Sequence, residues 1–110
     1  MMAWDRELED IVRADLGLRA GLSEKPMFGG LAWLLDGHLL CGASRQGLLV
    51  RLGKGNDAFA LAIDGVGPVR MGQRAMEGWV RASPEACSDE ILRRRLIGEA
   101  IAFVDTLPPK

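Results

Sequence analysis

The sequence predicts an α+β fold: one antiparallel sheet of about five strands, with helices from the N- and C-terminal ends of the chain packed on it. Apolar residues recur at helical spacing near both ends, whereas short apolar runs and turn residues alternate in the middle. The dipeptide Asp36-Gly37 separates two of these runs and is typical of a β-hairpin, because a type I′ turn needs positive φ at both central residues. Helices gathered against a largely antiparallel sheet form a two-layer domain.

Both end helices are predicted to be amphipathic. The first is expected over residues 4–18, where the apolar residues share one helical face: Trp4, Leu8, Ile11, Val12 and Leu16. The second ends before Pro108 and is capped either by Ser88, or by Ser83 with Pro84 at the first helical position. Its apolar stripe is wide: Ile91, Leu92, Leu96, Ile97, Ala100, Ile101, Val104 and Leu107.

The middle of the chain predicts strands and one short helix. Three antiparallel strands form a meander within residues 27–52, after a polar connection at 23–26. A short helix is expected over 57–63, followed by two short strands at 69–71 and 77–82. The first two strands of the meander are apolar on both faces, so neither face can simply be left in water. Helices or another subunit are expected to cover them.

At 110 residues the chain fits a single domain, residues 1–110, that should bury roughly two-thirds of its unfolded surface. Apolar residues make up 48% and charged residues 26%, which is ordinary globular composition. Cys41 and Cys87 are expected to be buried thiols in a reducing compartment. The sequence has no segment typical of a signal peptide or a membrane span, so we expect a cytoplasmic protein without membrane contact.

The charge of the chain is nearly balanced. Fourteen basic residues against fifteen acidic ones give a formal net charge of -1, which disfavours nucleic-acid binding because no excess of Lys and Arg can neutralise phosphates. Basic residues nevertheless outnumber acids in the middle of the chain: Arg45, Arg51, Lys54, Arg70, Arg74 and Arg81. A solvated strand face is the simpler interpretation, and a modest basic binding face is the alternative.

Known catalytic, cofactor and metal motifs do not fit the sequence. The glycines around Lys54 and at 65–67 lack the spacing of phosphate-binding and dinucleotide-binding loops. His38 and Cys41 are three positions apart on a predicted strand, which would put their side chains on opposite faces. One His with two distant Cys cannot assemble a structural zinc site. We therefore expect no enzyme activity, no cofactor and no metal.

A candidate interaction surface is formed by residues that lack a full structural explanation: Met27, Phe28, Gly29, Gly30, Met76 and Trp79. Paired glycines at the start of a strand are typical of a bulge, a bend or a close backbone approach. Structurally, they would let the first helix cross the sheet; functionally, they would leave room for a ligand. Met and Trp side chains suit an adaptable binding surface and equally suit a core.

Several motifs resemble the N-terminal domain of the TfoX/Sxy competence-regulator family. The most specific is the combination of Met27-Phe28-Gly29-Gly30 with Met76-Glu77-Gly78-Trp79-Val80, supported by the Asp36-Gly37 hairpin, the strand at 48–52 and the ending at 103–110. The resemblance covers residues 4–110 and departs at Ala75, where the family pattern has Pro. It implies a compact α+β domain similar to secretion chaperones and brings no catalytic residues.

The resemblance also implies a function. Full-length members of the family regulate natural competence genes, together with a cyclic-AMP-responsive activator, and carry a second, C-terminal domain. This chain resembles the stand-alone members. We therefore expect a non-enzymatic regulatory or adaptor domain that binds an unidentified protein, such as a transcription regulator, or a second copy of itself. The alternatives are a small-molecule-binding domain, with a pocket between the sheet and the terminal helix near Trp79 and Met27, and a DNA-contacting module.

Overall fold

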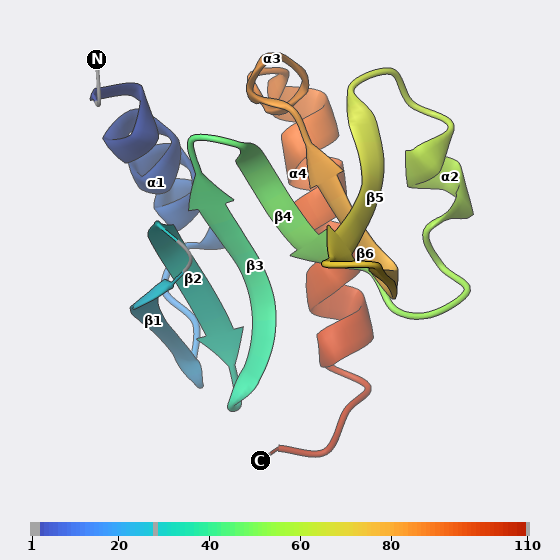
Figure 1. Cartoon of the computed structure of the whole chain (residues 1–110). Helices are drawn as coiled ribbons and strands as arrows, with labels where there is room; N and C mark the ends of the chain where they lie inside the picture. Colours follow the sequence, from blue (N-terminus) through green and yellow to red (C-terminus); the bar gives the residue numbers. More distant parts are fainter. Residues whose placement is uncertain (1–2, 28, 110) are drawn as a thin grey trace.

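The structure, a computed structural model, describes residues 3–27 and 29–109 (Figure 1). Helices and strands follow one another in the order α1 (Ala3–Leu16), β1 (Leu22–Met27), β2 (Gly30–Leu35), β3 (His38–Ser44), β4 (Gly47–Arg51), α2 (Ala58–Leu61), β5 (Val66–Met71), β6 (Arg74–Ala82), α3 (Pro84–Cys87) and α4 (Glu90–Val104).

The strands of the described chain form one sheet, in the order β1-β2-β3-β4-β6-β5, with every neighbouring pair antiparallel. The α+β prediction is confirmed, but the sheet has six strands rather than about five. The additional strand is β1, which covers the expected polar connection at 23–26. Its four central residues are exposed, so it belongs to the sheet through backbone pairing with β2 and lacks the apolar alternation that predicts a strand.

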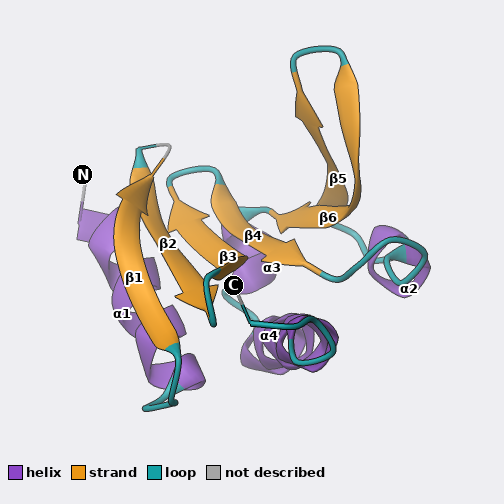
Figure 2. Cartoon of the chain, turned by 90° about the horizontal axis from the view of Figure 1, so that it is seen from below, coloured by secondary structure: helices purple, strands orange, loops and turns teal. Residues whose placement is uncertain are grey.

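Helices α1 and α4 lie on one face of the sheet (Figure 2). Helix α1 packs on β3, and α4 packs on β3 and β4. Both amphipathic faces are largely confirmed, although Ile91 is 82% exposed. The core between the two layers includes Leu8, Val12, Leu16, Trp33, Leu35, Leu40, Cys41, Ala43, Leu48, Val50, Val80, Ala82, Leu96, Ile97, Ala100 and Val104. The opposite face of the sheet, which we call the open face, is turned away from α1 and α4.

The β2–β3 hairpin turns at Asp36 and Gly37, whose φ values are +53° and +86°, which confirms the predicted turn. Its register contains one irregularity: Trp33 pairs with Cys41, whereas Leu34 pairs with Leu39. Leu40 is therefore an extra residue, a β-bulge. The bulge shifts the alternation of side chains, which explains why Leu40 and Cys41 are both fully buried.

The β5–β6 hairpin bends away from the rest of the sheet and rises on the side opposite α4 (Figure 2). Its register shifts between Pro68 and Arg70, and Gly78 in β6 has a φ of +85°. The carbonyl of Gly78 accepts hydrogen bonds from the amides of Leu52 and Gly53, at 2.7 and 3.1 Å. Any Cβ at this position would collide with the backbone of Gly53 and Lys54, so the bend requires glycine.

The terminal helical region is capped twice. Ser83 Oγ accepts a hydrogen bond from the amide of Ala86 and caps α3, with Pro84 in its first turn, so this cap begins a separate short helix and not the terminal helix for which it was predicted. Helix α4 is capped by Asp89 rather than by Ser88, since Asp89 Oδ1 accepts from the amides of Ile91 and Leu92.

Candidate functional site

The open face contains a shallow hollow of about 50 Å³ over β2, β3 and β4. We call it the open-face hollow and define it by the following lining residues: Met27, Ala32, Leu39, Gly42, Leu49 and Arg81. Its lining is mostly apolar, with the guanidinium of Arg81 and the polar side chains of Ser44 and Gln46 at its border.

The sheet register places four of these residues in one row. Ala32 pairs with Gly42, Gly42 with Leu49, and Leu49 with Arg81. Their chain neighbours Leu48 and Val50 are fully buried toward the helices, so alternation along β4 turns Leu49 to the open face. Gly42 has no side chain, and its position in the middle of the row produces the hollow.

The fold does not bring all residues of the predicted interaction surface together. Met27 lines the open-face hollow, Gly29 lies in the β1–β2 turn with a φ of +76°, and Phe28 lies outside the described residues. Met76 and Trp79 are partly buried on β6, which β2, β3 and β4 separate from β1. With a strand spacing of about 4.8 Å, Met27 and Trp79 are roughly 19 Å apart across the sheet.

Gly30 and Trp79 have structural partners. A Cβ at Gly30 would collide with the Ala43 carbonyl and the Ser44 side chain of β3, so this glycine permits close approach of two strands and not a crossing by the first helix. The guanidinium of Arg51 lies 5.5 Å from the ring centroid of Trp79 and 5.5 Å from that of Phe103 on α4.

Of the six residues that define the hollow, only Met27 belongs to the predicted interaction surface, and five were missed: Ala32, Leu39, Gly42, Leu49 and Arg81. Three features of the sequence could have indicated these residues: strands of the meander that are apolar on both faces, a glycine in the interior of a predicted strand, and basic residues in the middle of the chain. Only the pairing of β4 with β6, which are not consecutive in the chain, brings Arg81 beside Leu49.

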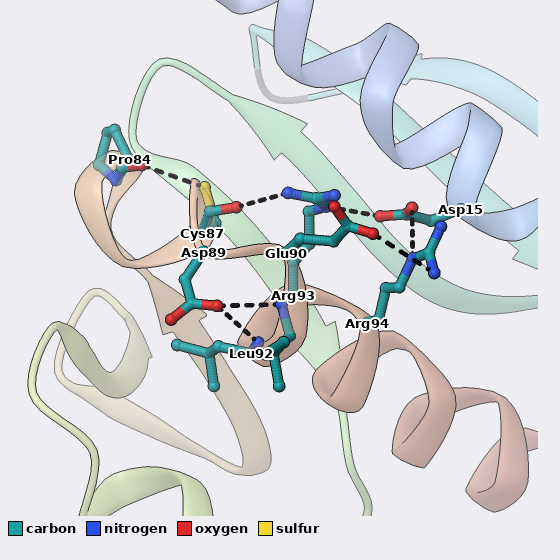
Figure 3. A network of polar contacts seen from close by, with 9 residues as sticks. Asp15, Pro84, Cys87, Asp89, Glu90, Leu92, Arg93 and Arg94 are labelled. Carbon is teal, nitrogen blue, oxygen red and sulfur yellow. Dashed lines mark hydrogen bonds and ion pairs between the residues drawn. The ribbon is translucent and has the colours of Figure 1, made fainter.

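Away from the hollow, a group of polar and charged residues joins α1, α3 and α4 (Figure 3). The carboxylate of Asp15 accepts hydrogen bonds from Arg93 Nε at 2.5 Å and from Arg94 Nε at 3.3 Å, while Arg93 Nη1 donates to the Cys87 carbonyl at 3.2 Å. The side chains of Asp15 and Arg93 are 5% and 8% exposed. Because the charges of Asp15 and Arg93 are paired and largely shielded from solvent, these two residues hold the helices together.

The thiols and the single histidine form no reactive cluster in the described chain, where no three His, Cys, Asp or Glu side chains could hold a metal. Burial raises the pKa of Cys41 to about 12 and also raises the pKa of Cys87. Contrary to simple alternation, the bulge at Leu40 puts His38 and Cys41 on the same side of the sheet, where their partners are Leu35 and Trp33. His38 Nε2 lies 2.7 Å from the carbonyl oxygen of Pro108, so the partner of the ring is the C-terminal segment and not Cys41.

Larger, open hollows lie on the helical side of the described chain. One, of about 270 Å³ between α1 and α3, is lined by Glu7, Leu8, Ile11, Pro84, Cys87 and Ser88. Another, of about 460 Å³ beside α4, is lined by Leu52, Asn56, Glu99, Ala102, Phe103 and Thr106. A further one, of about 430 Å³ between α1 and α4, is lined by Asp15, Arg19, Arg94, Ile97, Gly98 and Ile101. Met27 therefore faces a different hollow from the one beside the terminal helix. Within residues 3–27 and 29–109, no helix has the length and apolar character needed to cross a membrane.

Comparison with protein families gives one match. The model of the TfoX N-terminal domain matches residues 15–104, from the last turn of α1 to the end of α4. No curated protein and no solved structure matches the chain. The match spans all six strands and includes both segments on which the sequence resemblance depends. The chain therefore belongs to the TfoX N-terminal domain family.

Proposed function

We propose that this domain is a non-enzymatic regulatory adaptor that binds another protein through the open-face hollow and the apolar side chains around it. Membership of the TfoX N-terminal domain family supports a regulatory role. We connect this regulatory role with the transcription of competence genes. The partner we propose is therefore a transcription regulator.

The observation that carries this proposal is the half-buried apolar surface of the open face. Helices α1 and α4 cover one side of the sheet, whereas Leu34, Leu39 and Leu49 on the other side remain partly exposed. An apolar strand face that no helix of the described chain covers is typical of a surface completed by another protein. The balance of charge in the chain adds to this, because it favours a protein partner over nucleic acid.

Affinity capture from a lysate of the source organism tests the proposal. We expect a partner that binds the wild-type chain and is lost with Leu49→Asp and with Met27→Asp. Ile91→Asp is the matched control, because Ile91 is 82% exposed at the start of α4. Retention of the same partner by Leu49→Asp, with its fold verified by circular dichroism, would contradict the proposal. Sedimentation of the wild-type chain identifies the case in which the partner is a second copy.

A small-molecule-binding domain is the second candidate, favoured by the open hollow of about 460 Å³ beside α4. A ligand present at 100 times its dissociation constant adds about 2.7 kcal/mol to the free energy of unfolding. This change raises the melting temperature of a small domain by several degrees, so a thermal-shift screen of metabolite classes detects it. The absence of any shift would remove this candidate.

A further inference from the structure

Arg81 stands at one end of the open-face hollow with an unsatisfied donor. Its Nε atom is buried, yet it has no hydrogen-bond partner in the described chain. Burying a donor of a charged group without an acceptor is unfavourable, so such atoms are rare in native proteins. Because Arg81 lines the hollow beside Leu49, an acceptor arriving from outside the chain would be well placed to reach this guanidinium.

Gly42 supplies a second, independent observation. Its φ is not positive, and a Cβ built on it would meet only the Leu31 carbonyl at 3.4 Å and the Ala32 Cα at 3.9 Å, which are ordinary contacts. Neither the backbone nor the packing therefore requires glycine here, although glycine weakens the interior of a strand. The missing side chain keeps open a hollow of about 50 Å³, which is the space for an incoming apolar group.

The charges around the hollow indicate the chemistry of its occupant. The row Ala32-Gly42-Leu49 is bordered by Lys25 on β1 and by Arg81 on β6. The nearest acid of β1, Glu24, is directed to the other side of the sheet, where it accepts hydrogen bonds from Arg13 and Trp33. An apolar strip between two cations is complementary to a segment that carries apolar side chains flanked by carboxylates.

The shape of the sheet selects a helix as the occupant. Both edge strands contain a proline, Pro26 in β1 and Pro68 in β5, which removes a backbone donor that an added strand would need. A hollow of about 50 Å³ is also too small for most small-molecule ligands. The face between β2 and β6 spans roughly 14 Å and is walled by the rising β5–β6 hairpin (Figure 2), so it accepts a helix about 10 Å wide.

We infer that the open-face hollow is the docking seat for an acidic amphipathic helix of a partner protein. One apolar side chain of that helix enters the space above Gly42, and an Asp or Glu carboxylate two turns or less away pairs with Arg81. The inference rests on the proposed function, which it deepens by naming the chemistry of the partner. Recognition of this kind uses apolar anchors for affinity and one charge pair for register.

The test is a selection from displayed 16-residue helical peptides against the full chain. The apolar face of each peptide is fixed as Leu, and the flanking positions vary among Asp, Glu, Asn, Gln, Ser and Lys. We expect selected peptides to share an acid at one flanking position. Replacing that Glu by Gln in the peptide should weaken binding to the wild-type chain by at least about tenfold, and should change little with Arg81→Met.

Variants of the chain separate the inference from the proposal beneath it. Gly42→Val fills the hollow and should weaken every selected peptide, whereas Arg19→Met, an exposed cation beyond the end of α1, should weaken none. One outcome overturns the inference alone: the selected peptides share no acid, bind wild type and Arg81→Met equally, and fail to bind Gly42→Val. The proposed function would then still stand. Peptides indifferent to both Arg81→Met and Gly42→Val would overturn both. The Glu→Gln change is made in the peptide, so the expected loss of binding to the wild-type chain is measured without any variant of the domain, and circular dichroism verifies the fold of Arg81→Met and Gly42→Val.

Discussion

Asp15 and Arg93 form an ion pair across 78 positions of the chain, joining the last turn of α1 to the first turn of α4. Both side chains are more than nine-tenths buried, and Arg93 also donates to the Cys87 carbonyl at the end of α3. A pair in this position costs desolvation energy but leaves an uncompensated charge if one partner is removed. The relative placement of three helices therefore depends on it.

Removal of Arg93 tests that dependence. Arg93→Met should lower the free energy of unfolding by about 3 kcal/mol, the lower end for a broken buried pair, because the Asp15 carboxylate loses its buried partner and keeps only the exposed Arg94. Asp15→Leu combined with Arg93→Met should cost less than the two single changes added together. Urea denaturation measures all three. Arg94→Met is the control, since Arg94 is 64% exposed and should cost less than about 1 kcal/mol. Equal losses for Arg93→Met and Arg94→Met would refute the structural role.

Glu24 should make stability depend on pH. Hydrogen bonds from Arg13 hold the pKa of Glu24 below its ordinary value of 4.5, and Trp33 Nε1 adds a weaker contribution. A carboxyl whose folded pKa is lowered stabilises the fold above its unfolded pKa, and this contribution is lost as pH falls through the folded pKa. Unfolding free energies measured downward from pH 5 should therefore drop less for Glu24→Gln than for wild type. The exposed Glu99→Gln serves as control, and a wild-type slope in Glu24→Gln would count against the pair.

Both thiols should resist modification in the native state. Cys41 and Cys87 are 0% and 2% exposed, and burial raises the pKa of Cys41 to about 12, so little thiolate exists at pH 8. Ellman's reagent should react slowly with the folded chain and with two thiols per chain in urea. Mass spectrometry assigns the modified residue. Rapid native labelling of Cys41 would show that the sheet opens more readily than its packing implies.

Gly78→Ala should destabilise the domain by more than about 2 kcal/mol, because the φ of +85° is strained for alanine and its Cβ would collide with the backbone of Gly53. Gly67→Ala in the neighbouring strand β5 is the matched control. Nothing lies within 4 Å of a Cβ at Gly67, so the change should stay within about 0.5 kcal/mol. Thermal unfolding compares the two variants, and similar melting temperatures would exclude Gly78 as the pivot of the hairpin.

Gly42→Ala should have the opposite sign. The Cβ fits without collision, and alanine reduces the conformational entropy of the unfolded chain, so the unfolding free energy should rise by about 0.5 kcal/mol. Denaturation in urea measures the gain. A loss of more than about 1 kcal/mol would mean that the strand itself needs glycine, and that the hollow is a by-product of the backbone.

Local signals in the sequence account for much of the fold. The Asp36-Gly37 turn and the amphipathic α1 and α4 are set by residues close together in the chain, and the structure confirms them. Ser83 does act as a cap, but of the short helix α3, while Asp89 caps α4. Strand β1 escaped prediction because an exposed edge strand is recognised by its partner and not by its own pattern. The bulge at Leu40 and the bend at Gly78 depend on neighbouring strands in the same way.

The candidate site was less accessible to prediction. Met27 could be named because it belongs to a recognisable motif, but Gly78 of the second motif acts in the backbone and away from the hollow. Arg81 appeared only as one of several basic residues in the middle of the chain. Its importance comes from the pairing of β4 with β6 and from a buried Nε without an acceptor, and neither property can be deduced from residue order.

The order of the strands has a consequence for how the chain folds. Within the described residues, four of the five strand pairings join consecutive strands, and the remaining one joins β4 to β6 across an insertion. Contacts between neighbours in sequence close short loops and form early. The strands of the meander β1–β4 and of the hairpin β5–β6 can therefore pair independently of each other. The docking of α1 against α4 closes a much longer loop than any of these pairings, so it carries the larger loop-closure entropy, and we expect it to form after the strands have paired.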